Sequence, residues 1–181
     1  MNRAARRRSR TRPTLLAAAL LAASLHVVAA PGPRLGDAGY FSTPGLDVLA
    51  FSNTYDGNFS DAKIAGVELI HHGVRTATNG DVRLAPTPEQ WDAAATLVER
   101  IVDAKTGTVT TRMRFEAEDF DYAVRVAPRG DGVVLQVLLD KPLPAALAGK
   151  AGFNLEFLPS AYFGTSWVMD DGCGQAPLYP G

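Results

Sequence analysis

The stretch that decides the fold is residues 108–139, TVTTRMRFEAEDFDYAVRVAPRGDGVVLQVLL. Apolar and polar residues alternate along 108–116, 120–127 and 133–139, and short turn-forming runs separate these segments. Alternation with a period of two is typical of strands, because successive side chains of a strand point to opposite faces of the sheet. The stretch therefore predicts three successive strands. The third is apolar on both faces, and we expect both faces to be covered.

The same reading extends upstream. Residues 96–103 precede the turn-forming run Asp-Ala-Lys-Thr-Gly, and we expect them to pair with 108–116 as a hairpin. A short helical turn is expected before them, near Trp91. Apolar runs at 46–52 and 67–71 predict two further strands.

One turn signal lies between these regions, at Asn79-Gly80. Asn and Gly tolerate the positive φ that tight turns need, so we expect a hairpin tip there, with strands at 74–78 and 82–84. Residues 152–158 (GFNLEFL) predict the last strand. About eight strands at short intervals, with turn residues between them, predict an all-β antiparallel sandwich, mutarotase-like or immunoglobulin-like in general architecture.

The N-terminus has the three regions of a secretory signal peptide. Six arginines lie within the first 12 residues, an apolar run rich in Ala and Leu covers 15–28, and small residues follow. This run is shorter than the roughly 20 residues that a comfortable membrane span needs. We expect cleavage after Ala29, a mature start at Ala30, and a secreted or periplasmic protein.

The chain is therefore divided into a signal peptide (1–29), a flexible lead (30–38) and a β-sandwich domain (39–181). The lead is rich in Pro and Gly. The last residues, PLYPG, follow several aromatics and add neither a strand nor a polar tail. We expect from this that the domain is truncated at its C-terminus.

Charge and cysteine content exclude several classes of protein. Removing six arginines from 18 basic residues leaves 12 against 19 acidic residues, a net charge of −7 for the mature part. Nucleic-acid phosphates demand a basic surface, so we expect no nucleic-acid partner, and after signal removal no membrane partner. Cys173 is the only cysteine, which excludes an intrachain disulfide and a cysteine-based metal site.

Two groups of residues invite a chemical reading. His71-His72 resembles a metal-binding pair, but neighbours in a strand point to opposite faces, so we expect the imidazoles to diverge; no metal and no cofactor is predicted. Four acids, Glu116, Glu118, Asp119 and Asp121, gather at a turn. They could bind Ca²⁺ or supply paired carboxylates, and a solvated hairpin end is the commoner meaning of such a cluster. No catalytic residue is assigned.

Carbohydrate contact is the remaining reading. Residues 52–63, read as a loop, mix Tyr55 with short acids and amides. A ring can cover the face of a pyranose while polar groups bind its hydroxyls, although the same mixture also builds ordinary turns. Trp91 and Trp167 could each be a sugar platform or a core residue. Tyr55, Trp91 and Trp167 are thus the candidate contacts.

Three phrases add a resemblance to a family: FSNTYDGNFSDAKIAGVELIHHGVRTATNGDVRL, LPAALAGKAGFNLEFLPSAYFG and PLYPG. Together they resemble the N-terminal region of secreted bacterial family 9 glycoside hydrolases, the cellulase or endoglucanase type, over roughly 40–181. The resemblance implies a β-rich region that precedes an immunoglobulin-like module and a helical (α/α) barrel. In that family the barrel carries the acid and base carboxylates, and no matching motif is present here.

Two hypotheses follow. The first is an accessory N-terminal domain of a secreted hydrolase of cellulose-type β-glucan, with no complete catalytic site, whose partners are a polysaccharide or oligosaccharide and a downstream catalytic domain. The second is a stand-alone carbohydrate-binding or structural β-sandwich without catalysis.

Overall fold

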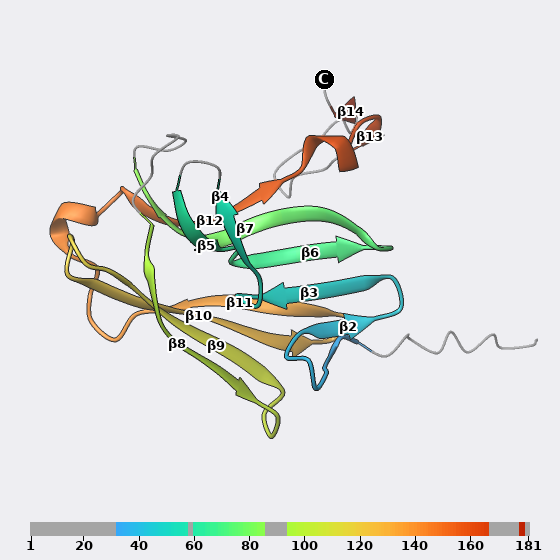
Figure 1. Ribbon diagram of the computed structural model, residues 1–181, viewed down its shortest axis with the longest axis horizontal. Coiled ribbons are helices and arrows are strands. Elements are labelled where there is room, and N and C mark those ends of the chain that lie inside the picture. Colours follow the sequence, from blue (N-terminus) through green and yellow to red (C-terminus); the bar gives the residue numbers. More distant parts are fainter. Residues whose placement is uncertain (1–31, 58–59, 86–93, 167–177, 180–181) are drawn as a thin grey trace, which may run out of the picture.

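The computed structural model describes residues 32–57, 60–85, 94–166 and 178–179 of the chain. These residues form two antiparallel sheets, and buried apolar side chains from both sheets join in one core (Figure 1). The predicted all-β sandwich is thereby confirmed. Within the described ranges, no helix has the length and apolar content of a membrane span.

The larger sheet has six strands in the spatial order β1-β2-β3-β6-β7-β12. They are β1 (Arg34–Leu35), β2 (Phe41–Thr43), β3 (Leu46–Ala50), β6 (Val67–His71), β7 (Val74–Leu84) and β12 (Ala151–Phe157). The smaller sheet has the order β11-β10-β9-β8. Its strands are β8 (Thr96–Asp103), β9 (Thr108–Phe115), β10 (Phe120–Arg129) and β11 (Gly132–Leu138).

Shorter elements lie at the margins of these sheets. Two strand pairs are β4 (Thr54–Gly57) with β5 (Ser60–Ile64), and β13 (Thr165–Ser166) with β14 (Leu178–Tyr179). Two single 3₁₀ turns are η1 (Ala145–Leu147) and η2 (Pro159–Ala161). The second turn directly follows β12 and directs the chain away from the sheet (Figure 1).

The core forms where the alternating apolar residues of the two sheets meet. Phe115, Phe120 and Tyr122 of the smaller sheet stack with ring centroids 5.7–6.2 Å apart. Polar contacts also join the sheets: Tyr122 donates its hydroxyl to Asp81 Oδ1 at 2.9 Å. Arg100 donates Nε to the carbonyl oxygen of Ala50 at 2.8 Å, across from β8 to β3. The sandwich is thus held by apolar burial, with a few buried hydrogen bonds between its layers.

Most of the predicted strands are found. The segments predicted at 46–52, 67–71, 96–103, 108–116, 120–127, 133–139 and 152–158 correspond to β3, β6, β8, β9, β10, β11 and β12. The helical turn predicted near Trp91 lies outside the described residues.

The predicted hairpin tip at Asn79-Gly80 is wrong. Both residues lie inside β7, which runs on through them, and the turn between β6 and β7 is at His72-Gly73. Asn79 does adopt the positive φ that its sequence suggested, 54°, but as part of a β-bulge. Gly80 is needed for a close approach, since a Cβ there would lie 2.7 Å from the Cβ of Val67.

Two segments are more ordered than predicted. The lead 30–38 was expected to be flexible, yet Arg34 and Leu35 pair with Ser42 and Phe41 as an edge strand. Residues 52–63 were expected to be a loop, yet they contain β4 and β5. In both places backbone N–H and C=O groups find ladder partners, a requirement that side-chain patterns do not reveal.

The prediction that both faces of the 133–139 strand are covered is also wrong. This strand is β11, the edge of the smaller sheet, and Val137, Leu138 and Leu139 remain about 40% exposed. An apolar sequence is compatible with two-sided burial, but the position of the strand in the sheet decides how much cover it receives.

Candidate functional site

Of the three predicted carbohydrate contacts, the structure describes only the backbone of Tyr55. Tyr55 belongs to β4, where the structure describes the backbone and not the side chain. Trp91 and Trp167 lie outside the described residues. The site that the structure does define lies immediately beside Tyr55, on the larger sheet.

This site is an open cavity of about 600 Å³, which we call the Glu68 pocket. Among the described residues, its wall carries mostly groups that form hydrogen bonds and two apolar side chains, Ala65 and Leu158. The lining residues are Ser52, Asn53, Thr54, Ala65, Glu68, Arg75, Thr78, Asn79 and Leu158. Its volume lies within the roughly 300–1,000 Å³ typical of small-molecule sites, but its wall is more polar than most.

The pocket forms where the chain between β3 and β6 returns to the sheet. The backbone N–H of Ala65 donates to the carbonyl of Asn53 at 2.9 Å, and that of Asn79 donates to the carbonyl of Ala65 at 3.0 Å. These bonds fix the base of the β4–β5 hairpin against β7 (Figure 1). Residues 52–54, the start of the 52–63 stretch that was predicted as a loop, are thereby placed on the pocket wall.

Glu68 is the central residue of the pocket, with a side chain only 2% exposed. Its Oε1 accepts hydrogen bonds from Thr78 Oγ1 at 3.2 Å and from Arg75 Nε at 2.7 Å. Its Oε2 accepts a short hydrogen bond from Asn53 Nδ2. A buried carboxylate is costly unless it is paired, and here three donors from two segments surround it.

The β-bulge at Asn79 is what assembles these donors. Val67 pairs with Gly80 and Leu69 pairs with Ala77, so β7 has two residues where β6 has only Glu68. The two residues are Thr78 and Asn79, and the extra residue places Thr78 within reach of the Glu68 carboxylate. A lone acid inside the apolar run Val67–Ile70 is the signal in the sequence that could have indicated a buried polar site.

A group of three rings, two of them exposed, lies at the end of β12. The rings of Phe157 and Tyr162 meet edge to face with centroids 5.5 Å apart. Phe157 is 58% exposed and Phe163 is 61% exposed. Leu158, which follows Phe157, lines the Glu68 pocket and donates its N–H to the carbonyl of Thr76. We call Phe157, Tyr162 and Phe163 the aromatic corner.

Sequence reasoning missed the aromatic corner. Its signal was the density of aromatics in FNLEFLPSAYF, where Pro159 interrupts the strand and leaves the following rings without a sheet to cover them.

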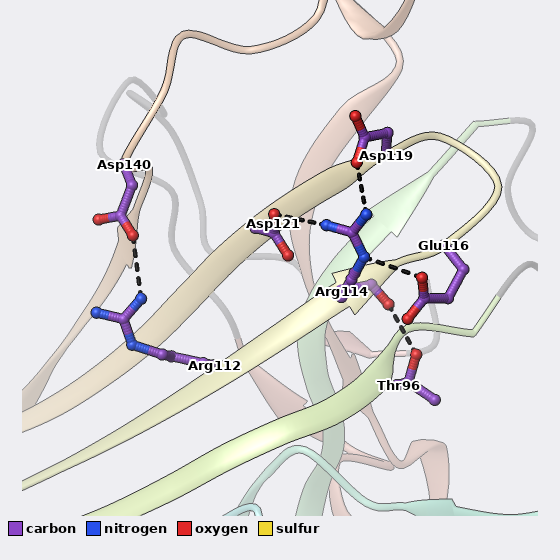
Figure 2. Close-up of polar contacts among 7 residues, drawn as sticks. All are labelled: Thr96, Arg112, Arg114, Glu116, Asp119, Asp121 and Asp140. Carbon is purple, nitrogen blue, oxygen red and sulfur yellow. Dashed lines mark hydrogen bonds and ion pairs between the residues drawn. The ribbon is translucent and has the colours of Figure 1, made fainter.

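The acidic turn is a cluster of ion pairs around Arg114, between β9 and β10 (Figure 2). Figure 2 shows the guanidinium between three carboxylates: Nε contacts Glu116 at 2.9 Å, Nη1 contacts Asp121 at 2.7 Å, and Nη2 contacts Asp119 at 2.5 Å. The hydrogen bonds with Asp121, Glu116 and Asp119 raise the pKa of Arg114. All three acids are more than half exposed, which is the arrangement expected of a solvated hairpin end.

One further carboxylate, that of Asp81, lies half-buried between the sheets. Its Oδ1 accepts hydrogen bonds from the Tyr122 hydroxyl at 2.9 Å and from the Val82 N–H at 2.7 Å. Burial raises the pKa of the Asp81 carboxyl to about 6, although both hydrogen bonds and the nearby charge of Arg83 act in the opposite direction. Burial likewise raises the pKa of the Tyr122 hydroxyl, and the neighbouring Asp81 raises it further.

The prediction that the His71 and His72 rings diverge is wrong. The two rings meet edge to face with centroids 4.4 Å apart. The reason is that His72 lies beyond the end of β6, in the turn with φ 48°, so the alternation of a strand does not apply to it. Among the described residues, no three or more His, Cys, Asp or Glu side chains gather in a way that could hold a metal ion.

Comparison with protein-family models, with curated proteins and with solved structures gave no match for this chain. The family resemblance therefore depends on the three quoted phrases alone.

Proposed function

We propose that this chain is a non-catalytic, carbohydrate-contacting β-sandwich domain that serves a secreted glycoside hydrolase of the β-glucan or cellulose type. The phrases that resemble family 9 glycoside hydrolases supply the hydrolase class, and the signal-like N-terminus supplies the location outside the cytoplasm. N-terminal sequencing of exported protein tests the location, and a start at Ala30 is the expected result.

The observation that carries the proposal is the aromatic corner, whose Phe157 directly precedes Leu158 of the Glu68 pocket wall. Exposed rings pack well against the C–H face of a pyranose, and the polar wall of the pocket offers donors and acceptors for hydroxyl groups. Exposed apolar groups rimmed by polar residues often mark a ligand-binding surface. The combination suits a polymer that is apolar on its ring faces and polar at its edges.

The carboxylates support a non-catalytic role. Glycoside hydrolysis needs two carboxyl groups at a set separation across a cleft, one of them kept protonated by its surroundings. Glu116, Asp119 and Asp121 share one guanidinium on an exposed turn, where water and Arg114 favour their ionised forms. Glu68 is the single carboxylate among the described residues that line its pocket, and Asp81 is bound by the Tyr122 hydroxyl between the sheets.

Affinity electrophoresis in gels that contain mixed-linkage glucan tests the proposal. The protein should be retarded, and the double variant Phe157→Ala/Phe163→Ala should migrate as it does in a gel without glucan. Phe153→Ala is the matched control, since Phe153 lies on the same strand outside the aromatic corner. Reducing-sugar release from the same glucan should equal the buffer blank.

Two results would contradict the proposal. Equal migration of the wild-type protein with and without glucan would remove the carbohydrate contact. Sugar release that disappears on replacement of one carboxylate would place a catalytic site within this domain.

A further inference from the structure

We propose that the Glu68 pocket is a subsite for one uncharged sugar unit, held through two neighbouring hydroxyl groups, with Arg75 donating to one and Glu68 accepting from the other. This inference rests on the proposed function, because it identifies which part of a glycan the site takes. The inference adds a preference for an uncharged sugar and two specific hydrogen-bond contacts, neither of which the aromatic corner alone implies.

The first argument is the hydrogen-bonding capacity that the pocket retains. A carboxylate offers about four lone-pair sites, and Glu68 uses three of them, for Asn53, Thr78 and Arg75. A guanidinium has five N–H groups, and within the described contacts Arg75 uses only its Nε–H, towards Glu68. One acceptor position and several donors thus lie side by side at the pocket wall. Two neighbouring hydroxyls can satisfy both at once, one donating and one accepting.

The second argument is charge. Glu68 and Arg75 are the only charged residues that line the pocket within the described part of the chain, and they pair with each other at 2.7 Å. An anionic sugar would meet the Glu68 carboxylate behind Arg75, and a cationic one would meet the Arg75 guanidinium. An uncharged ligand meets neither penalty, because the pair is already neutral as a whole.

The third argument is rigidity. The Glu68 carboxylate is held by donors from the segment before β4 and from β7, and the bulge at Asn79 fixes the second of these. Asn79 is itself tied to β12, where its Nδ2 donates to Glu156 Oε2 at 2.7 Å. Groups that are already ordered lose little conformational entropy when a ligand binds, so even a few hydrogen bonds can give measurable affinity.

The smaller cavity on the other sheet is less suited to this ligand. It has a volume of about 230 Å³ and is lined by Arg112, Asp119, Asp121, Asp140 and Lys141, together with apolar residues. Arg112 already pairs with Asp140 at 3.0 Å, and Arg114 binds both aspartates of the turn. Several charged groups of both signs gather there, and an uncharged sugar would have to compete with the ion pairs that these groups already form.

Titration calorimetry with cellotetraose tests the proposal on the full chain. Arg75→Lys keeps the charge but loses the planar set of donors, and Glu68→Gln loses one acceptor. Each should weaken the Kd about 10-fold, the effect of one charge-assisted hydrogen bond. Arg112→Lys is the matched control, since Arg112 is also 50% exposed and also pairs with one carboxylate. Its Kd should equal that of the wild type. A tetramer of galacturonate should bind more weakly than cellotetraose.

A measurement without variants covers the case in which Glu68→Gln does not fold. In ¹H–¹⁵N spectra of the wild-type protein, the Nε–H resonance of Arg75 should shift on addition of cellotetraose, while that of Arg112 should not. An unmoved Arg75 resonance with saturable binding would overturn the subsite and leave the proposed function standing. So would unchanged Kd values in both folded pocket variants, if the aromatic-corner variant loses binding. Tighter binding of galacturonate would overturn the charge preference. Absence of binding to any glucan would overturn the proposed function and this inference together.

Discussion

Two ion-pair sites of this protein have opposite arrangements of buried and exposed charge. In the Glu68 pocket one carboxylate is 2% exposed and its arginine, Arg75, is 50% exposed. In the acidic turn the arginine, Arg114, is 28% exposed, and the carboxylates of Glu116, Asp119 and Asp121 are 52–87% exposed. The turn has three ion pairs and the pocket has one, yet of these two sites only the pocket holds a carboxylate that is almost completely buried.

The difference teaches that the exposure of the partners, rather than the number of ion pairs, decides what a site contributes. Exposed pairs exchange contacts with water for contacts with each other and gain little, and salt screens them. A buried charge that loses its partner cannot return to water, so its partner matters far more. The acidic turn is therefore a solvated end of the sheet. In the pocket, by contrast, the buried Glu68 carboxylate needs its particular hydrogen-bond donors.

The largest effect is expected for Arg75→Ala. This variant leaves the Glu68 carboxylate buried without its guanidinium, although Asn53 and Thr78 still donate to it. Unfolding in urea should show a loss of about 3–4 kcal/mol, towards the lower end for a broken buried pair. Arg114→Ala removes three ion pairs and should lower the melting midpoint less. If Arg114→Ala proves more destabilising than Arg75→Ala, the exposure of the partners does not decide what an ion-pair site contributes to stability.

A smaller effect is expected for Asp81, a half-buried carboxylate bound to a hydroxyl. The pKa of Asp81 is about 6 in the folded protein, above the ordinary value of 3.8. Between pH 3.8 and pH 6, Asp81 therefore keeps a proton in the folded state that it has released in the unfolded state. Unfolding then releases a proton, and stability should fall as pH rises from about 4 to about 6, by up to about 3 kcal/mol in all. Above that range the contribution should be constant.

Asp81→Asn isolates this effect, because Asn has no proton to release and its carbonyl oxygen can still accept from Tyr122. Urea midpoints measured from pH 4 to pH 7 should lose most of their pH dependence in the variant. The variant should also be the more stable protein at pH 7. An unchanged pH profile would show that Asp81 is ionised in the folded state without cost.

The smallest effect is expected at the bulge that brings Thr78 to Glu68. Asn79 has φ 54°, a conformation that Ala adopts with strain of about 1–2 kcal/mol and that Gly adopts freely. Both replacements lose the bond to Glu156, so the difference between them measures the backbone term. Asn79→Ala should melt below Asn79→Gly, with a gap in unfolding free energy of about 1 kcal/mol. Equal melting midpoints would show that the bulge relaxes when Asn79 is replaced.

The strands were predictable, since alternation of apolar and polar residues in 108–139 leaves no other way to bury one face. The candidate site was predictable only in part. The stretch 52–63 drew attention because of Tyr55 and its polar neighbours, and of this stretch residues 52–54 line the pocket. Glu68 drew no attention, because the sequence does not show which residues will donate hydrogen bonds to an acid in an apolar run. Its donors Asn53 and Thr78 lie 15 and 10 residues away.

The amino-acid sequence by itself determined that this chain forms strands and which of their faces are apolar, because that pattern depends on neighbours along the chain. It also indicated that Asn79 can take a positive φ, which that residue type tolerates. Whether this φ serves a hairpin tip or a bulge was decided by tertiary structure, since His72-Gly73 already turns the chain and Gly80 is needed against Val67. Tertiary structure alone also decided that β11 lies at an edge and that Glu68 is enclosed. Both depend on which strands become neighbours in space, and that choice minimises the exposed apolar surface and the unpaired polar groups of the whole molecule.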